Sequence, residues 1–210
     1  MTRTVLRILL TLLPAGAEVV DRLAVTVNKH VVTERQIVQD LRITAFVEQK
    51  TPDLSGAAKR EEAARIVDQI LILREAADNH VPLPGSEEAE KMLAPVRLQY
   101  ASQPEFQAAL ARYRISEAEL AARLLASLQA LRFSQLRFRQ EVDISEQDLR
   151  VYYDALARKD STGKGLPSFE AGKERLQTLL MDERTMQALD EWLRIARAEA
   201  QIVYREAAFE

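Results

Sequence analysis

Residues 23–33 read L-A-V-T-V-N-K-H-V-V-T, and the rest of the chain has to be arranged around them. Two runs rich in β-branched residues flank Asn28 and Lys29, which predicts a short β-hairpin with an Asn-led turn. Thr33 precedes Gln36 by three residues, the spacing of a capping box, so a helix should begin at about Glu34. A lone hairpin is only marginally stable in water, and it needs a third strand or a helix packed on it.

The second stretch with a clear strand pattern lies at the opposite end of the chain, where residues 201–205 read Q-I-V-Y-R. Pairing this segment with the hairpin is the economical way to give the hairpin a third strand. Ile202 and Tyr204 would then share one face of a small sheet that ties the last helix to the first. The predicted fold class is therefore mainly α, a multi-helix core with a small β-sheet formed by an N-terminal hairpin and the C-terminal strand.

The chain between these strands is predicted to be helical. Ala, Leu, Glu, Arg and Gln are abundant, aromatic residues make up 6%, and six glycines and seven prolines leave little room for an all-β fold. The second capping box, Ser116 with Glu119, opens the longest segment of this region. Helices are expected at about residues 34–50, 57–79, 86–102 with a kink at Pro95, 104–113, 117–142, 145–158 and 169–200, the last as one helix or two.

The first 17 residues have the order of segments found in signal peptides. Arg3 and Arg7 are followed by an apolar run, residues 8–13, and then by Ala15-Gly16-Ala17, which fits a small-x-small cleavage pattern. The apolar run is shorter than the roughly 20 residues that span a bilayer, so stable membrane insertion is not expected. We predict a signal peptide over 1–17, a helical region over 18–158, a linker over 159–167, and a closing helix and strand over 168–210.

Composition argues against several classes of function. The net charge is -3 and is spread along the chain, so the sequence lacks the basic patch that nucleic-acid binding requires. No cysteine is present, which excludes disulfides and thiolate metal sites. The two histidines, His30 and His80, lack partners at helical spacing, and the pairs Glu61-Glu62 and Glu87-Glu88 suit the first turns of helices. We expect no catalytic residue, no cofactor and no metal site.

The predicted helix over 117–142 carries more apolar side chains than one face can hold. One stripe contains Leu120, Leu124, Leu128, Leu131, Phe138 and Val142. Leu125 and Leu136 lie well round from that stripe, and Phe133 falls roughly opposite it. Either both surfaces are buried by other helices, or the second lines a groove for unfolded polypeptide, kept soluble by Arg132, Arg137 and Arg139. The candidate peptide-binding residues are Tyr100, Phe106, Tyr113, Leu125, Phe133 and Leu136.

The order of these segments resembles the chaperone core of the SurA-type periplasmic family. Four stretches carry the resemblance, and together they cover nearly the whole chain after the leader. They are the hairpin and helix start at 21–33, Ile144-Ser145-Glu146 followed by Tyr152-Tyr153, the helix over 169–193, and the closing strand. Active family members have a parvulin-type prolyl-isomerase domain between the second and third stretches. Here only residues 159–167 fill that place, far fewer than the roughly 40 that a small domain needs.

The resemblance implies a periplasmic or otherwise extracytoplasmic chaperone without isomerase activity. Its partners would be unfolded exported polypeptides, with the precursors of outer-membrane β-barrels as the client class. The alternative is a helical structural or assembly module that binds one specific partner or itself as a homodimer. Sequence alone does not separate these two functions, because one apolar face would serve either of them.

Overall fold

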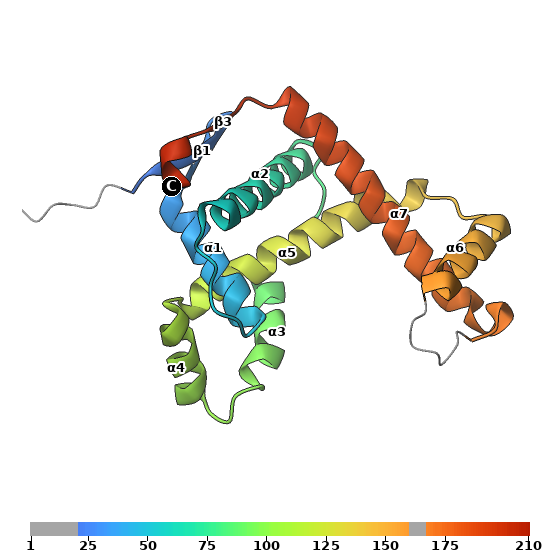
Figure 1. The fold of residues 1–210 in the computed structure, drawn as a ribbon, viewed down its shortest axis with the longest axis horizontal. Helices are drawn as coiled ribbons and strands as arrows, with labels where there is room; N and C mark the ends of the chain where they lie inside the picture. The colour runs from blue at the N-terminus through green and yellow to red at the C-terminus, as the bar shows by residue number, and fades with distance from the viewer. Residues whose placement is uncertain (1–20, 160–166) are drawn as a thin grey trace, which may run out of the picture.

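The computed structural model describes residues 21–159 and 167–210, and it confirms the predicted fold class. Seven α-helices and one three-stranded sheet make up the described chain (Figure 1). The predicted signal peptide over 1–17 and most of the predicted linker over 159–167 lie outside the described residues.

The two ends of the described chain meet in the sheet. Strands β1 (Leu23–Val27), β2 (His30–Thr33) and β3 (Ile202–Tyr204) pair antiparallel in the order β2-β1-β3, with Thr26 opposite Val203. Asn28 forms the hairpin turn with a positive φ of 53°, a conformation that asparagine tolerates better than most residues. Its side-chain oxygen also accepts a hydrogen bond from the Gln201 N–H at 3.0 Å. The predicted pairing of the chain ends is therefore confirmed.

The helices follow the predicted order, with differences at their ends. They are α1 (Glu34–Val47), α2 (Gly56–Asp78), α3 (Ser86–Arg97), α4 (Gln103–Tyr113), α5 (Glu117–Arg137), α6 (Glu146–Lys159) and α7 (Phe169–Glu199). Helix α3 contains Pro95 and ends two residues after it, at Arg97, instead of reaching Ser102. Helix α5 ends at Arg137 and a 3-10 turn follows, whereas α7 is one helix of 31 residues.

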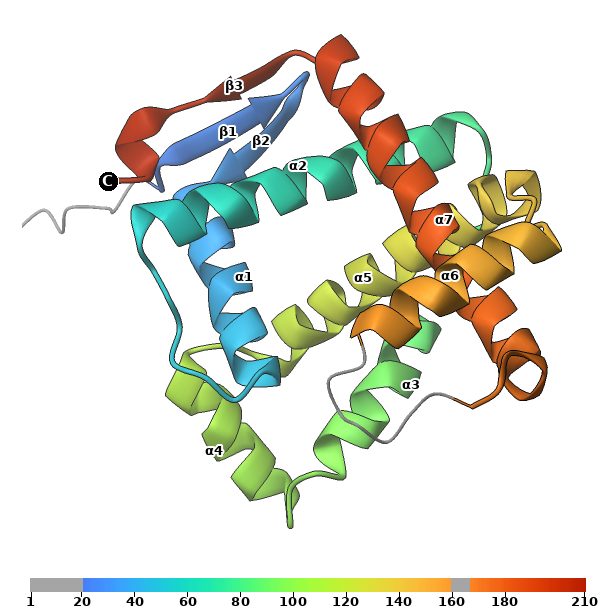
Figure 2. The same ribbon diagram turned by 45° about the vertical axis from the view of Figure 1, so that its right-hand side comes forward.

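Buried side chains form three clusters. The largest lies between the sheet and α1, α2, α5 and α7, and it includes the aromatic side chains Phe133, Phe138 and Trp192. The second joins α1, α3, α4 and α5 around Phe46 and Phe106. The third is separate and small, and holds α6 against the N-terminal half of α7 through Leu149, Leu176 and Leu180. Figure 2 shows α6 and this half of α7 at the end of the molecule opposite the sheet.

The C-terminus closes over the start of α2. Phe209 is buried, and a 3-10 turn, Glu206–Ala208, brings its carbonyl so close to Gly56 that a Cβ there would overlap the oxygen. Lys59, also on α2, donates from Nζ to a Glu34 carboxylate oxygen at 2.7 Å and to the Glu210 carbonyl at 3.4 Å. The first turns of α1 and α2 and the end of the chain are thus joined at one place.

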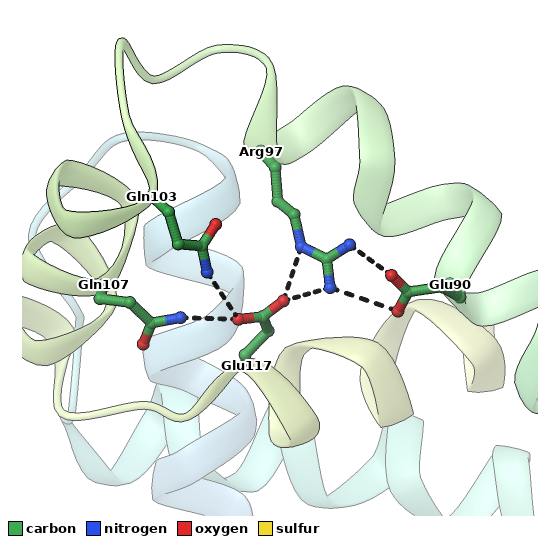
Figure 3. A network of polar contacts seen from close by, with 5 residues as sticks. All are labelled: Glu90, Arg97, Gln103, Gln107 and Glu117. Carbon is green, nitrogen blue, oxygen red and sulfur yellow. Dashed lines mark hydrogen bonds and ion pairs between the residues drawn. The ribbon is translucent and has the colours of Figure 1, made fainter.

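A polar network holds the α3–α4 hairpin to the start of α5 (Figure 3). Arg97 donates from Nε to a Glu117 carboxylate oxygen at 2.6 Å and also pairs with Glu90. The other Glu117 oxygen accepts from Gln107 at 2.6 Å and from Gln103 at 3.4 Å. Both oxygens of one carboxylate in the first turn of α5 are therefore shared between α3 and α4.

Asp148 should make the docking of α6 on α7 sensitive to acid. Its carboxylate accepts from the Ser145 hydroxyl and N–H, and it pairs with Arg184 of α7. These contacts lower the pKa of Asp148 from 3.8 to about 2. Because the folded-state pKa is lowered, this stabilisation is present above the unfolded-state pKa and is lost as pH falls from about 3.8 towards 2.

We therefore expect Asp148→Asn to be less stable than the native protein at neutral pH, with the difference shrinking towards pH 2. Melting temperatures followed by circular dichroism over this range measure it. Asp154→Asn, at an exposed position of the same helix, is the control. A constant difference between Asp148→Asn and the native protein at every pH would contradict the assigned role.

Candidate functional site

A large concavity lies where β2, α1, α2 and α5 converge. Its volume is about 770 Å³, within the range of roughly 300–1,000 Å³ typical of ligand pockets. Figure 2 shows β2 passing behind α2 and leading into α1. We call this concavity the central cavity; its lining is His30, Val31, Val32, Arg35, Gln36, Gln39, Asp40, Arg42, Ile43, Ile66, Ile70, Glu119, Ala122, Arg123 and Ala126.

Small side chains on α5 leave the space open. Ala122 and Ala126 are one turn apart on the face of α5 that lines the cavity. Ile66 and Ile70 hold the corresponding positions on α2, and both also pack against the main core. One wall of the cavity is therefore apolar and supported from behind by the core.

The edge strand of the sheet forms part of the rim. β2 has β1 on one side only, and Val31 is 49% exposed. The Ala24 carbonyl and the Asn28 N–H both form hydrogen bonds on the side of β3. Because backbone groups alternate in direction along a strand, the N–H and carbonyl groups of Val25 and Val27 point towards β2. Val31, which is opposite Thr26, then directs its own N–H and carbonyl away from the sheet. An extended chain in the cavity could hydrogen-bond to these two groups.

A cluster of ionisable side chains lies on the helical side of the cavity. Burial raises the pKa of Asp40 on α1, and the positive charges of Arg123 and Arg65 partly oppose this. Glu62 on α2 is 1% exposed, and burial likewise raises its pKa, against the opposing effect of Arg65 and Arg123. The nearest Arg65 nitrogen is 2.7 Å from the Glu62 oxygen, although this oxygen has no partner with good hydrogen-bond geometry. Two desolvated carboxyls thus lie within the electrostatic reach of the same arginines.

The positive side chains of the cavity are less fully paired than its acids. Arg42 and Arg123 make no ion pair with any side chain that the structure describes, and Arg123 donates only to the Ser127 hydroxyl, at 2.6 Å. Glu119, in contrast, accepts from both the N–H and the hydroxyl of Ser116, each at 2.7 Å, and this contact lowers its pKa. Half-buried guanidinium groups are therefore available to a ligand.

Three of the six candidate peptide-binding residues come together, but not in an open groove. Tyr100, Phe106 and Tyr113 pack around Phe46 of α1, with ring centroids 5.4–6.4 Å apart. Phe106 is fully buried, whereas Tyr100 and Tyr113 are half-buried. This group belongs to the second core cluster and stabilises the α3–α4 hairpin against α1.

The other three residues are distributed along α5. Phe133 is fully buried, with its ring 5.9 Å from that of Phe138 and 5.3 Å from that of Trp192. Leu125 is half-buried. Leu136 lines a second concavity of about 670 Å³, at the crossing of α5 and α7, with Met181 opposite. The six residues therefore do not share one exposed groove in the structure, because α7 covers the face of α5 that carries Phe133.

The central cavity was not predicted from the sequence, because its lining residues follow the same patterns as residues of a helix core or of a solvated helix face. Ile66 and Ile70 fit a core stripe, and Arg42 and Arg123 fit solvated helix faces. The signal that could have indicated a hollow is the small pair Ala122 and Ala126 within a leucine-rich helix. Small residues on a helix that packs against several others leave unfilled space unless a neighbour moves in.

The described part of the chain holds no group of three or more His, Cys, Asp or Glu side chains suited to a metal ion. Within residues 21–159 and 167–210, no helix combines the length and the apolar content that crossing a bilayer requires. Comparison with family models and with curated proteins finds no match to this chain. The candidate site therefore has to be interpreted from its own geometry and chemistry.

Proposed function

We propose that this protein is an extracytoplasmic chaperone that holds unfolded segments of exported polypeptides in the central cavity, without catalysing a reaction. The observation that carries the proposal is the cavity itself, an open space of about 770 Å³ with an apolar wall, charged groups and an edge strand. Mixed lining of this kind suits a polypeptide, which brings apolar side chains, charges and backbone groups together. A broad cavity with few fixed polar contacts gives low sequence specificity, as a chaperone requires.

The fold supports the same proposal through the resemblance to the SurA-type core. The hairpin, the helices and the closing strand occur in the expected order, and the strand pairs with the hairpin. The segment joining α6 to α7 is too short for a parvulin-type domain, so the proposal includes no isomerase activity. The extracytoplasmic location and the outer-membrane β-barrel precursors as clients come from the leader pattern and from the resemblance.

Suppression of aggregation tests the proposal. A denatured β-barrel protein is diluted into buffer with a stoichiometric amount of this protein, and light scattering is followed. We expect the native protein to slow aggregation, and Ala122→Trp to lose most of this effect because the indole projects from the α5 wall and obstructs part of the cavity. Ala108→Trp, on the exposed face of α4, is the matched control and should behave as the native protein does.

Two outcomes would count against the proposal. If the native protein leaves aggregation unchanged, the chaperone function fails. If Ala122→Trp is as active as Ala108→Trp, chaperone activity lies elsewhere on the molecule and the central cavity is not its site. Circular dichroism of both variants checks that each is folded.

The second candidate function is an assembly module, and exposed apolar side chains on α6 and α7 favour it. Val151 on α6 is 60% exposed, and Leu179 and Met186, two turns apart on α7, are 41% and 44% exposed. Exposed apolar side chains grouped on one part of a molecule often mark a binding surface. A stable dimer in sedimentation equilibrium that Met186→Lys disrupts, together with no effect on aggregation, would favour the module over the chaperone.

A further inference from the structure

We infer that the central cavity selects polypeptide segments in which a carboxylate stands next to apolar side chains. The inference rests on the proposed function and specifies its substrate class. Its basis is the charge complementarity between such a segment and the arginines that line the cavity.

The cavity has an excess of unpaired positive charge although the whole chain is negative. Three arginines line it, and of these Arg35 is within 3.5 Å of Asp21. Arg42 on α1 and Arg123 on α5 remain without an ion pair among the described side chains, and both are half-buried. A guanidinium group in such a position gains most from a carboxylate, because it can donate two parallel hydrogen bonds to it.

The acids of the cavity do not cancel this excess. Glu119 is occupied by the capping box with Ser116. Glu62 is not among the lining residues and pairs with Arg65. Of the two acids that line the cavity, Asp40 is the one that makes no hydrogen bond or ion pair with a side chain that the structure describes, and burial of its carboxyl disfavours a negative charge. A second carboxylate brought in by a ligand would compete with Asp40 for Arg123 and would push Asp40 towards its protonated form.

The apolar wall and the edge strand define the rest of the ligand. Ile66 and Ile70 offer a surface for aliphatic or aromatic side chains, and Val31 offers one N–H and one carbonyl to an extended backbone. Side chains of an extended chain alternate in direction. A segment lying along β2 would therefore place alternate side chains towards the α2 wall and leave those between them for the arginines or for solvent.

Three matched peptides test the selection. Each is a fluorescein-labelled segment of alternating valine and tyrosine with blocked termini, and the central residue is Glu, Gln or Lys. Fluorescence anisotropy at low salt gives the dissociation constant for each peptide. We expect the Glu peptide to bind about tenfold more tightly than the Gln peptide, the factor for one charge-assisted hydrogen bond, and the Lys peptide to bind most weakly. Higher salt should reduce the differences, because salt screens charges.

Substitutions with opposite expected effects separate recognition from a structural role. Arg123→Gln and Arg42→Gln should each reduce the preference for the Glu peptide. Asp40→Asn should increase it, because the competing acid is removed. Arg112→Gln, on the exposed face of α4, is the matched control and should leave the preference unchanged. A loss of folding would weaken binding of all three peptides together and would not produce effects of opposite sign.

The outcomes distinguish this inference from the proposed function. Equal binding of the three peptides, at any measurable affinity, overturns the charge selection and leaves the chaperone function standing. Failure of all three to bind refutes the use of the cavity for polypeptide. Preference for the Lys peptide reverses the inference and would assign the selection to Asp40 and Glu119.

Discussion

Replacing Gly56 with alanine is expected to lower the free energy of unfolding by about 2–4 kcal/mol, a cost comparable to losing much of a buried aromatic side chain. A Cβ at this position would overlap the Phe209 carbonyl oxygen, and a backbone carbonyl has little freedom to move aside. The C-terminal turn would have to leave the start of α2. Phe209 would then lose its burial, its contact with the Tyr204 ring at 6.2 Å and its position under the Arg60 guanidinium.

Gly172→Ala is the matched control, and the expected effect has the opposite sign. Gly172 lies in the first turn of α7, and a Cβ there would meet the Leu176 side chain at 3.7 Å, an ordinary van der Waals contact. Alanine favours helix over glycine by about 0.8–1.0 kcal/mol, so this variant should be slightly more stable than the native protein. Urea unfolding of both variants measures the difference. Equal stability of the two would show that the chain ends are not held together as tightly as the structure indicates.

Phe133→Ala is expected to destabilise the protein by about 3–5 kcal/mol, the usual cost of deleting a buried phenylalanine. The ring is fully buried between α5 and α7, where it packs with Phe138 and Trp192. Removing it leaves a cavity at the place where α7 joins the main core. Because Trp192 is the single tryptophan of the chain, its fluorescence reports directly on this region during unfolding.

Leu131→Ala on the same helix should cost less than about 1 kcal/mol, because an exposed side chain gives up little burial on truncation. Leu131 is 49% exposed, although it belongs to the same predicted apolar stripe as the buried Leu120. A cost for Phe133→Ala close to that for Leu131→Ala would contradict the close packing of α5 against α7. Such a result would also make Phe133 a candidate for contact with unfolded polypeptides again.

The difference between Phe133 and Leu131 shows why surfaces were harder to predict than elements. Helical periodicity correctly separated these two residues onto different faces of one helix. Both alternatives drawn from the sequence placed the Leu131 stripe in the core. In the structure α5 packs against α1, α2, α3 and α7 at different points along its length, so burial changes from turn to turn. A pattern within one helix does not contain this information.

Residues near one another in sequence determined the hairpin, the capped starts of the helices and the fold class. Asn28 at the turn, Thr33 with Gln36, and Ser116 with Glu119 act over three residues or fewer, so their effects can be read directly from the chain. The strand pattern at residues 202–204 also sufficed to predict that the two ends pair. One exposed hairpin needs a partner, and the chain offers one suitable segment.

Tertiary structure alone decided where space remains and which charges are left facing it. Ala122 and Ala126 become a cavity wall only because α1 and α2 are held away from them by the sheet and by the main core. Arg42 and Arg123 become available to a ligand because Glu119 and Glu62 are occupied by other groups and Asp40 forms no ion pair with them. Both results depend on distances between helices that are far apart in sequence. Those distances are set by the packing of side chains from all of the helices at once.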